Sequence, residues 1–153
     1  MRLLSLEVEN YRNIASASLT PGRELTVICG NNGQGKTNLL EAIWLLTGGK
    51  SFRGGKDAEL VRRGEPFAVL KASTLRAQQE EQETEEPNRV RLTVGAPDSP
   101  RPGRTVSVNG GAVKRAAYNY LTEEWCLLLM ATSIYMMVYI SVICIGRIKM
   151  YIL

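Results

Sequence analysis

Residues 30–37 of the chain are Gly30-Asn31-Asn32-Gly33-Gln34-Gly35-Lys36-Thr37, which match the pattern GxxxxGK[ST] at every fixed position. The run follows Glu24–Cys29, a short apolar segment that is typical of a buried strand. Apolar side chains then recur on one face of a predicted helix that Gly48-Gly49 ends, namely Leu39, Leu40, Ile43 and Leu46. A strand before and a helix after are the context in which this pattern binds phosphate. The alternative is a glycine-rich turn with a chance lysine.

The pattern predicts a site for the phosphates of a nucleotide because each fixed position has a physical task. Glycines let the backbone fold into a nest whose N–H groups face one anion, and a helix that begins near Gly35 adds its positive dipole end. Lys36 supplies an ammonium for the β- and γ-phosphates, and Thr37 supplies a hydroxyl ligand for Mg²⁺. All eight residues are therefore candidate binding residues, and Thr37 is the candidate metal ligand.

The segments on either side of the phosphate loop and its helix predict strands. Strands combined with this helix predict the α/β fold class. Apolar and polar residues alternate from Leu4 to Val8, and a weaker strand is expected over Ala15–Leu19. A short helix is possible within Asp57–Arg63. Three further strands, with a hairpin turn at Asn109-Gly110, predict an antiparallel meander within 67–115; they are Phe67–Arg76, Arg89–Val94 and Thr105–Val108.

Composition sets limits on function. The 153 residues suit about one domain, and a net charge of +4 permits nucleic-acid binding without arguing for it. Cys29, Cys126 and Cys144 form no CxxC pair and the chain has no histidine, which disfavours a zinc site. Three scattered cysteines fit a reducing cytoplasm.

A phosphate loop alone does not hydrolyse a nucleotide, because phosphoryl transfer also needs an acid for Mg²⁺ and a group that orients water. No apolar run that ends in Asp or Glu follows the meander. Asp57, Asp98 and the acidic segment Gln78–Glu86 are expected to be solvated surface. We therefore name no catalytic residue and expect no hydrolysis by this chain alone.

The composition changes abruptly past residue 125. Isoleucine occurs three times in residues 1–125 and six times in 126–153, and Cys126–Gly146 is a run of 21 residues without a charge. Such a run is about long enough to span a membrane as a helix. A buried core element and a frameshifted or truncated reading frame are the other interpretations.

Two motifs carry a family resemblance. Tyr11-Arg12-Asn13 after the first strand, and Gly30–Ile43 with the extension Asn38-Leu39-Leu40-Glu41-Ala42-Ile43, resemble RecF and its relatives in the SMC and ABC-type ATPase group. Further segments are similar to the same family, namely Ser51-Phe52-Arg53, Asp57–Gly64, and Val108-Asn109-Gly110 with Lys114-Arg115.

The resemblance implies a P-loop NTPase fold, the incomplete first lobe of an ABC/SMC-like ATPase, over residues 1–121. Residues 122–153 are then a non-homologous apolar tail. It implies ATP and Mg²⁺ as cofactors, with Arg12 and Asn13 close to the bound nucleotide. Proteins of this family form ATP-dependent homodimers and bind DNA at single-strand/double-strand junctions. With RecR and RecO type proteins they assist recombinase loading in DNA replication, in repair of DNA damage and in the SOS response.

The chain departs from the family pattern in that it has no signature motif, Walker B acid, D-loop or switch histidine. An alternative function is a membrane-anchored P-loop nucleotide-binding module with Cys126–Gly146 as its span. A small kinase or GTPase is disfavoured, because the sequence has no array of lid arginines and no Asn-Lys-x-Asp motif.

Overall fold

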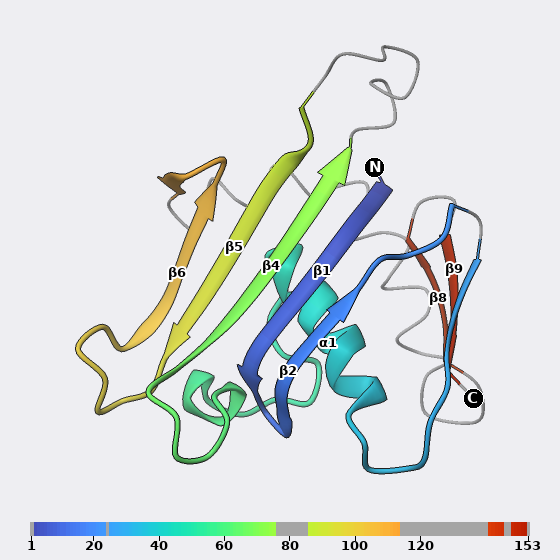
Figure 1. Ribbon diagram of the computed structural model, residues 1–153. Helices are drawn as coiled ribbons and strands as arrows, with labels where there is room; N and C mark the ends of the chain where they lie inside the picture. Colours follow the sequence, from blue (N-terminus) through green and yellow to red (C-terminus); the bar gives the residue numbers. More distant parts are fainter. Residues whose placement is uncertain (1, 24, 76–85, 114–140, 146–147, 153) are drawn as a thin grey trace.

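The fold is a large antiparallel sheet with one long helix against it and a small second sheet beside it (Figure 1). The computed structural model describes residues 2–23, 25–75, 86–113, 141–145 and 148–152. The large sheet has six strands in the order β2-β1-β4-β5-β6-β7, and each neighbouring pair is antiparallel. Their bounds are β1 Arg2–Tyr11, β2 Ile14–Leu19, β4 Phe67–Leu75, β5 Asn88–Gly95, β6 Gly103–Val108 and β7 Gly111–Val113. The predicted meander is therefore confirmed.

The first strand differs in detail from its sequence pattern. The register between β1 and β4 shifts between Leu3 and Ser5, so Leu4 is the extra residue of a β-bulge. Leu3, Leu6 and Val8 are buried, whereas Leu4 is only half-buried. The predicted alternation holds from Leu6 onward and is wrong before it, because a bulge reverses the side to which the preceding residues point.

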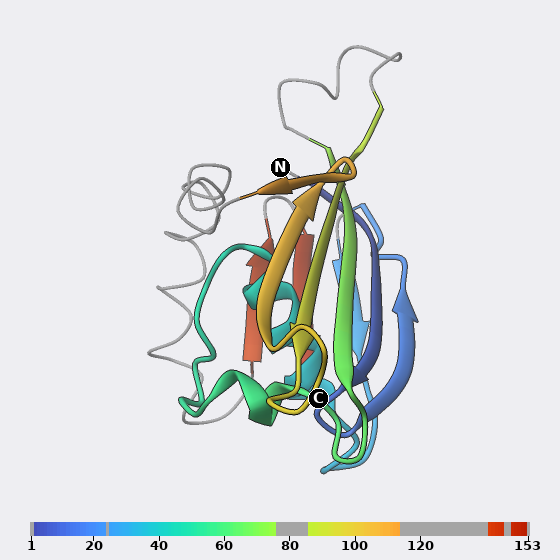
Figure 2. The same cartoon turned by 90° about the vertical axis from the view of Figure 1, so that its left-hand side faces the viewer.

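Helix α1 (Lys36–Leu46) lies against one face of the six-stranded sheet and contacts β1, β4 and β5 (Figure 2). Five of its apolar residues are buried in the hydrophobic core, whereas Leu39 and Trp44 are partly buried and pack against it. A 3-10 helix, η1 (Asp57–Leu60), follows α1 and confirms the short helix expected within Asp57–Arg63. Seven of the eleven residues of α1 are buried, so the helix is held against the sheet from Asn38 onward, directly after the end of the glycine-rich loop.

The second sheet has the order β3-β9-β8, with bounds β3 Leu25–Ile28, β8 Ser141–Ile145 and β9 Ile148–Ile152. β9 pairs in parallel with β3, the strand that leads into the phosphate loop. The prediction that Glu24–Cys29 is a buried strand is right in type and wrong in burial, because Val27 is 45% exposed. Glu24 itself lies outside the described residues.

The apolar run Cys126–Gly146 is described only at Ser141–Ile145, which form a strand rather than a helix. The remainder of that run lies outside the described residues. Within the described ranges, no helix has the length and apolar character to cross a membrane. The predicted boundary at residue 121 also falls outside these ranges and stays a prediction.

Candidate phosphate-binding site

The loop Gly30–Gly35 connects β3 to α1 and ends at a helix N-terminus, as the sequence predicts. Gly35 is the N-cap of α1 and has a left-handed backbone with φ of 100°. A Cβ atom at this position would lie 2.8 Å from Asn13 Oδ1. Glycine is therefore required here both by the backbone conformation and by the close approach of Asn13.

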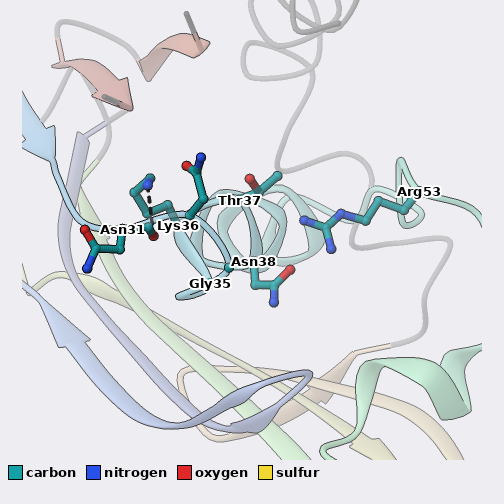
Figure 3. A pocket seen from close by; sticks show the side chains of 8 residues that line it. Asn31, Gly35, Lys36, Thr37, Asn38 and Arg53 are labelled. Carbon is teal, nitrogen blue, oxygen red and sulfur yellow. Dashed lines mark hydrogen bonds between the residues drawn. The ribbon is translucent and has the colours of Figure 1, made fainter.

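An open pocket of about 240 Å³ lies at this loop and the start of α1. Figure 3 shows its lining side chains, with Lys36 and Arg53 reaching it from different segments. Among the residues that the structure describes, these two cations are the charged residues of the lining, and it includes no acidic residue. The other lining residues are Asn31, Asn32, Gly33, Gly35, Thr37 and Asn38. Two cations beside a helix N-terminus make this pocket suited to an anion.

The ammonium of Lys36 lies back over the loop. Its Nζ donates to the carbonyl oxygens of Gly30 and Asn31, the latter at 3.2 Å, and the bond to Asn31 can be followed in Figure 3. Both contacts are solvent-exposed. The ammonium can therefore exchange these carbonyls for phosphate oxygens without leaving a buried acceptor unpaired.

A magnesium ion fits this site if the nucleotide and water supply most of its ligands. Thr37 lines the pocket and can offer one hydroxyl oxygen. In the part of the chain that the structure describes, no group of three His, Cys, Asp or Glu residues could hold a metal ion. This donor set fits Mg²⁺, which keeps several waters and takes few protein ligands when it binds with phosphates.

Asn13 holds the loop in shape from outside the pocket lining. Its Nδ2 donates to the Gly33 carbonyl at 2.8 Å, and its Oδ1 accepts from Asn38 Nδ2 at 2.6 Å. Asn38 is 7% exposed, and its Oδ1 is buried without a hydrogen-bond partner among the residues that the structure describes. Asn13, the last residue of the triplet Tyr11-Arg12-Asn13, therefore contacts the phosphate loop directly.

Arg12 points into a buried cluster with Glu41 of α1. Arg12 Nε and Nη2 donate to the two carboxylate oxygens at 2.5 and 2.9 Å, and Tyr11 Oη donates to Glu41 Oε2 at 2.7 Å. Burial acts to raise the pKa of Glu41, but hydrogen bonds from Arg12, Ser51 and Tyr11 outweigh it, so this pKa lies below its usual value. Burial and the neighbouring carboxylate raise the pKa of Tyr11. Glu41 is therefore ionised, and both of its carboxylate oxygens accept hydrogen bonds from the cluster.

The structure brings most of the predicted binding residues together. Six of the eight loop residues line the pocket, and Gly30 and Gln34 complete the loop without lining it. Arg12 and Asn13 do not line the pocket. Asp57 pairs with Arg104 at 2.6 Å and keeps 37% of its side chain exposed, and Asp98 is exposed as expected.

The sequence assigned no role to Arg53 or Asn38, although both line the pocket. Asn38 directly follows Thr37 in the first turn of the helix, and this position could have indicated that it lines the pocket. Arg53 reaches the pocket only because the segment after α1 turns back toward the N-terminus of that helix. No spacing in the sequence indicates the path of this segment.

Comparisons with known proteins agree with this geometry. A model of the family described as RecF/RecN/SMC N terminal domain matches residues 2–129. The DNA replication and repair protein RecF of Geobacter sp. (strain M21) is 46% identical over 78 residues, which are 51% of this chain and 21% of that protein. RecF of Anaeromyxobacter sp. (strain Fw109-5) is 56% identical over 64 residues, 42% of this chain and 17% of that protein.

Solved structures show the same likeness. The recombination mediator protein RecF-ATPrS of the RecFOR pathway superposes with a TM-score of 0.64 at 29% identity, over 76% of this chain and 29% of that one. A structure from work on ATP-driven dimerization of SMC ATPases has a TM-score of 0.65 at 22% identity, covering 77% of this chain and 75% of that one. The second likeness shows the fold alone. The chain spans about a fifth of the length of the curated relatives that it matches.

Proposed function

Because this chain belongs to the RecF/RecN/SMC N-terminal domain family, we propose that it binds the triphosphate of ATP, together with Mg²⁺, in the pocket at the N-terminus of α1. The observation that carries the proposal is the pocket lining, whose described residues are the phosphate loop, Asn38 and two cations, with no acid among them. Solved RecF structures with ATP and with an ATP analogue support it as family precedent.

Each residue of the site has a part in the proposed binding. Backbone N–H groups of the Gly30–Thr37 loop would face the phosphates, and Lys36 would leave its carbonyl partners for their oxygens. Thr37 would be the protein's ligand to Mg²⁺, which neutralises phosphate charge when it is bound. Arg53, in the segment between α1 and η1, supplies a second cation. Asn13 holds Gly33 in place because its side-chain Nδ2 donates to the Gly33 carbonyl.

The wider role that we propose is that of a RecF-type protein in DNA replication and recombinational repair in the cytoplasm. In this role the protein binds DNA at single-strand/double-strand junctions and dimerises when ATP is bound. It acts with RecR and RecO type proteins in recombinase loading and in the SOS response. The names of the curated relatives support the part of this role that concerns DNA replication and repair. Equal affinity of the ATP-loaded chain for a gapped duplex and a blunt duplex, measured by fluorescence anisotropy, would contradict the junction preference.

Nucleotide competition tests the proposed function. A fluorescent ATP analogue bound to the chain should be displaced by ATP at lower concentrations than by GTP, as the family assignment implies. AMP should displace it poorly, because it lacks the β- and γ-phosphates that Lys36 and Arg53 would contact, and chelation of Mg²⁺ should weaken binding. A preference for GTP, or displacement by AMP as effective as by ATP, would contradict the proposal.

A further inference from the structure

The segment that carries Arg53 to the pocket, residues 49–57, follows α1 and ends at the first residue of η1, and it is called here the Arg53 loop. Phe52, Arg53 and Lys56 are exposed, so no core packing of these side chains holds the loop in one position. Its tip holds Gly54 and Gly55 with φ of 71° and 93°. Such a glycine pair has many accessible conformations, and the position of Arg53 must therefore be set by the contacts at the base of the loop.

Both ends of the Arg53 loop are fixed by two side chains from other elements. Arg104 on β6 donates to the Gly49 carbonyl at 3.3 Å and pairs with Asp57 at 2.6 Å. Trp44 Nε1 on α1 donates to the Lys50 carbonyl at 2.6 Å. These contacts hold the two ends but do not reach Arg53 itself.

Ser51 joins Arg53 to the buried cluster. Its Oγ donates to Glu41 Oε1 at 2.5 Å and accepts from Arg12 Nη2 at 3.2 Å and from the backbone N–H of Arg53 at 3.3 Å. The Gly54 carbonyl also lies 3.2 Å from this oxygen. A hydroxyl has one proton and two acceptor positions, so the proton goes to the nearer acceptor, Glu41 Oε1, and the bonds from Arg12 and Arg53 fill the acceptor positions. The Ser51 hydroxyl therefore links the backbone of Arg53 directly to Glu41.

Glu41 in turn is fixed relative to the phosphate loop. It lies on α1, the helix that begins at Lys36, and its side chain is fully buried. Arg12, which grips both of its oxygens, has a left-handed backbone with φ of 50°, and its N–H donates to the Leu60 carbonyl at 2.9 Å. Arg12 is in the two-residue turn that joins β1 to β2, where a positive φ is usual, so the turn and the bond to Leu60 hold its backbone in place.

From these contacts we infer that Glu41, Arg12 and Ser51 form a buried clamp that positions Arg53 over the phosphate pocket. Glu41 and Ser51 are thus positioning residues for nucleotide binding, although neither lines the pocket. The inference rests on the proposed function, because Arg53 is taken to meet the phosphates of ATP. The clamp also gives a physical role to two residues that do not belong to the phosphate loop. These are Glu41 in the segment Asn38–Ile43 and Arg12 in the triplet Tyr11-Arg12-Asn13.

A double-mutant cycle on the full chain tests the clamp. ATP affinity is measured for the wild type, Ser51→Ala, Arg53→Ala and the double variant. Arg53→Ala should weaken ATP binding about tenfold, on the scale of one hydrogen bond between charged groups. Ser51→Ala should weaken it by a similar or smaller factor, and should have no further effect in the Arg53→Ala background, because Ser51 acts through Arg53.

Three controls separate positioning from a general loss of structure. Ser51→Thr keeps a hydroxyl and should restore most of the affinity that Ser51→Ala loses. Ser99→Ala removes a comparable hydroxyl, which donates to the Ala96 carbonyl at 2.7 Å in another loop, and should leave ATP affinity unchanged. The thermal unfolding midpoint of each variant shows that the chain is folded. Multiplicative losses in the double variant would overturn the clamp and leave the proposed function in place, whereas a folded wild type that binds no ATP would overturn both.

Discussion

Replacing Lys36 with Ala is expected to abolish detectable ATP binding while it leaves the thermal unfolding midpoint nearly unchanged. The ammonium contacts solvent-exposed carbonyls of its own loop, so folding does not depend on it. In the complex it would make charge-assisted hydrogen bonds to phosphate, each of which contributes about 1.5–3 kcal/mol. Isothermal titration calorimetry with Mg²⁺ and ATP measures the affinity, and a thermal melt measures the stability.

The matched control for Lys36 is Lys71→Ala. Lys71 lies on β4 and bonds Glu7 and Glu9 at 3.0 and 3.3 Å, with 39% of its side chain exposed. Its removal takes the same charge from the chain at a position outside the pocket lining. ATP affinity should therefore stay within about twofold of the wild type, since screening by salt weakens distant surface charges. Equal losses in the two variants would show that the chain attracts ATP only through its net charge.

Replacing Glu41 with Ala is expected to destabilise the fold by about 3–5 kcal/mol, as is usual when one partner of a buried ion pair is removed. The change leaves the Arg12 guanidinium, whose side chain is 16% exposed, without its carboxylate. It also removes the acceptor of the Tyr11 hydroxyl and of the Ser51 hydroxyl. Because a small domain has a total stability of only about 5–15 kcal/mol, urea denaturation should show a large fall in the midpoint.

Glu9→Ala is the control for Glu41, since it breaks an exposed ion pair with Lys71. Glu9 has 48% of its side chain exposed, and such surface pairs contribute about 0–1 kcal/mol. A Glu41 variant as stable as the Glu9 variant would contradict the buried cluster.

The effect of Glu41→Ala should also depend on pH. The folded-state pKa of Glu41 is lowered, so its stabilising contribution is fully present above the unfolded carboxyl pKa of about 4.3 and is lost as the pH falls through the lower folded value. The stability difference between wild type and variant should therefore shrink below about pH 4. A difference that stays constant to pH 3 would contradict an ionised Glu41.

Local sequence patterns predicted the parts of the fold that depend on neighbours along the chain. The Gly30–Thr37 loop lies between a strand and a helix because its glycines and the following apolar periodicity both act locally. The meander followed from three strand-like segments and from the Asn109-Gly110 turn, which joins β6 to β7 and in which both residues have positive φ. The bulge at Leu4 was missed, because a bulge depends on the partner strand and not on the pattern of one strand alone.

The parts that could not be predicted depend on contacts between distant residues. Glu41 resembled any polar position on a helix, and its burial depends on Arg12, which lies 29 residues earlier. Arg12 was expected near the nucleotide, yet its side chain binds Glu41 and does not line the pocket. Arg53 reaches the pocket only because the loop after α1 turns back. The parallel pairing of β9 with β3 joins segments more than 100 residues apart, which no local period can show.

The central claim is that the loop Gly30–Thr37 holds the phosphates of ATP, and a two-dimensional ¹H–¹⁵N NMR titration of the labelled chain with Mg²⁺ and ATP tests it most directly. The account predicts that the largest shifts fall on the amides of Gly33–Thr37 and of Arg53, and that Lys36→Ala abolishes them. Saturable shifts confined to another region such as β5 and β6, or a folded chain whose loop amides do not respond to ATP, would contradict it.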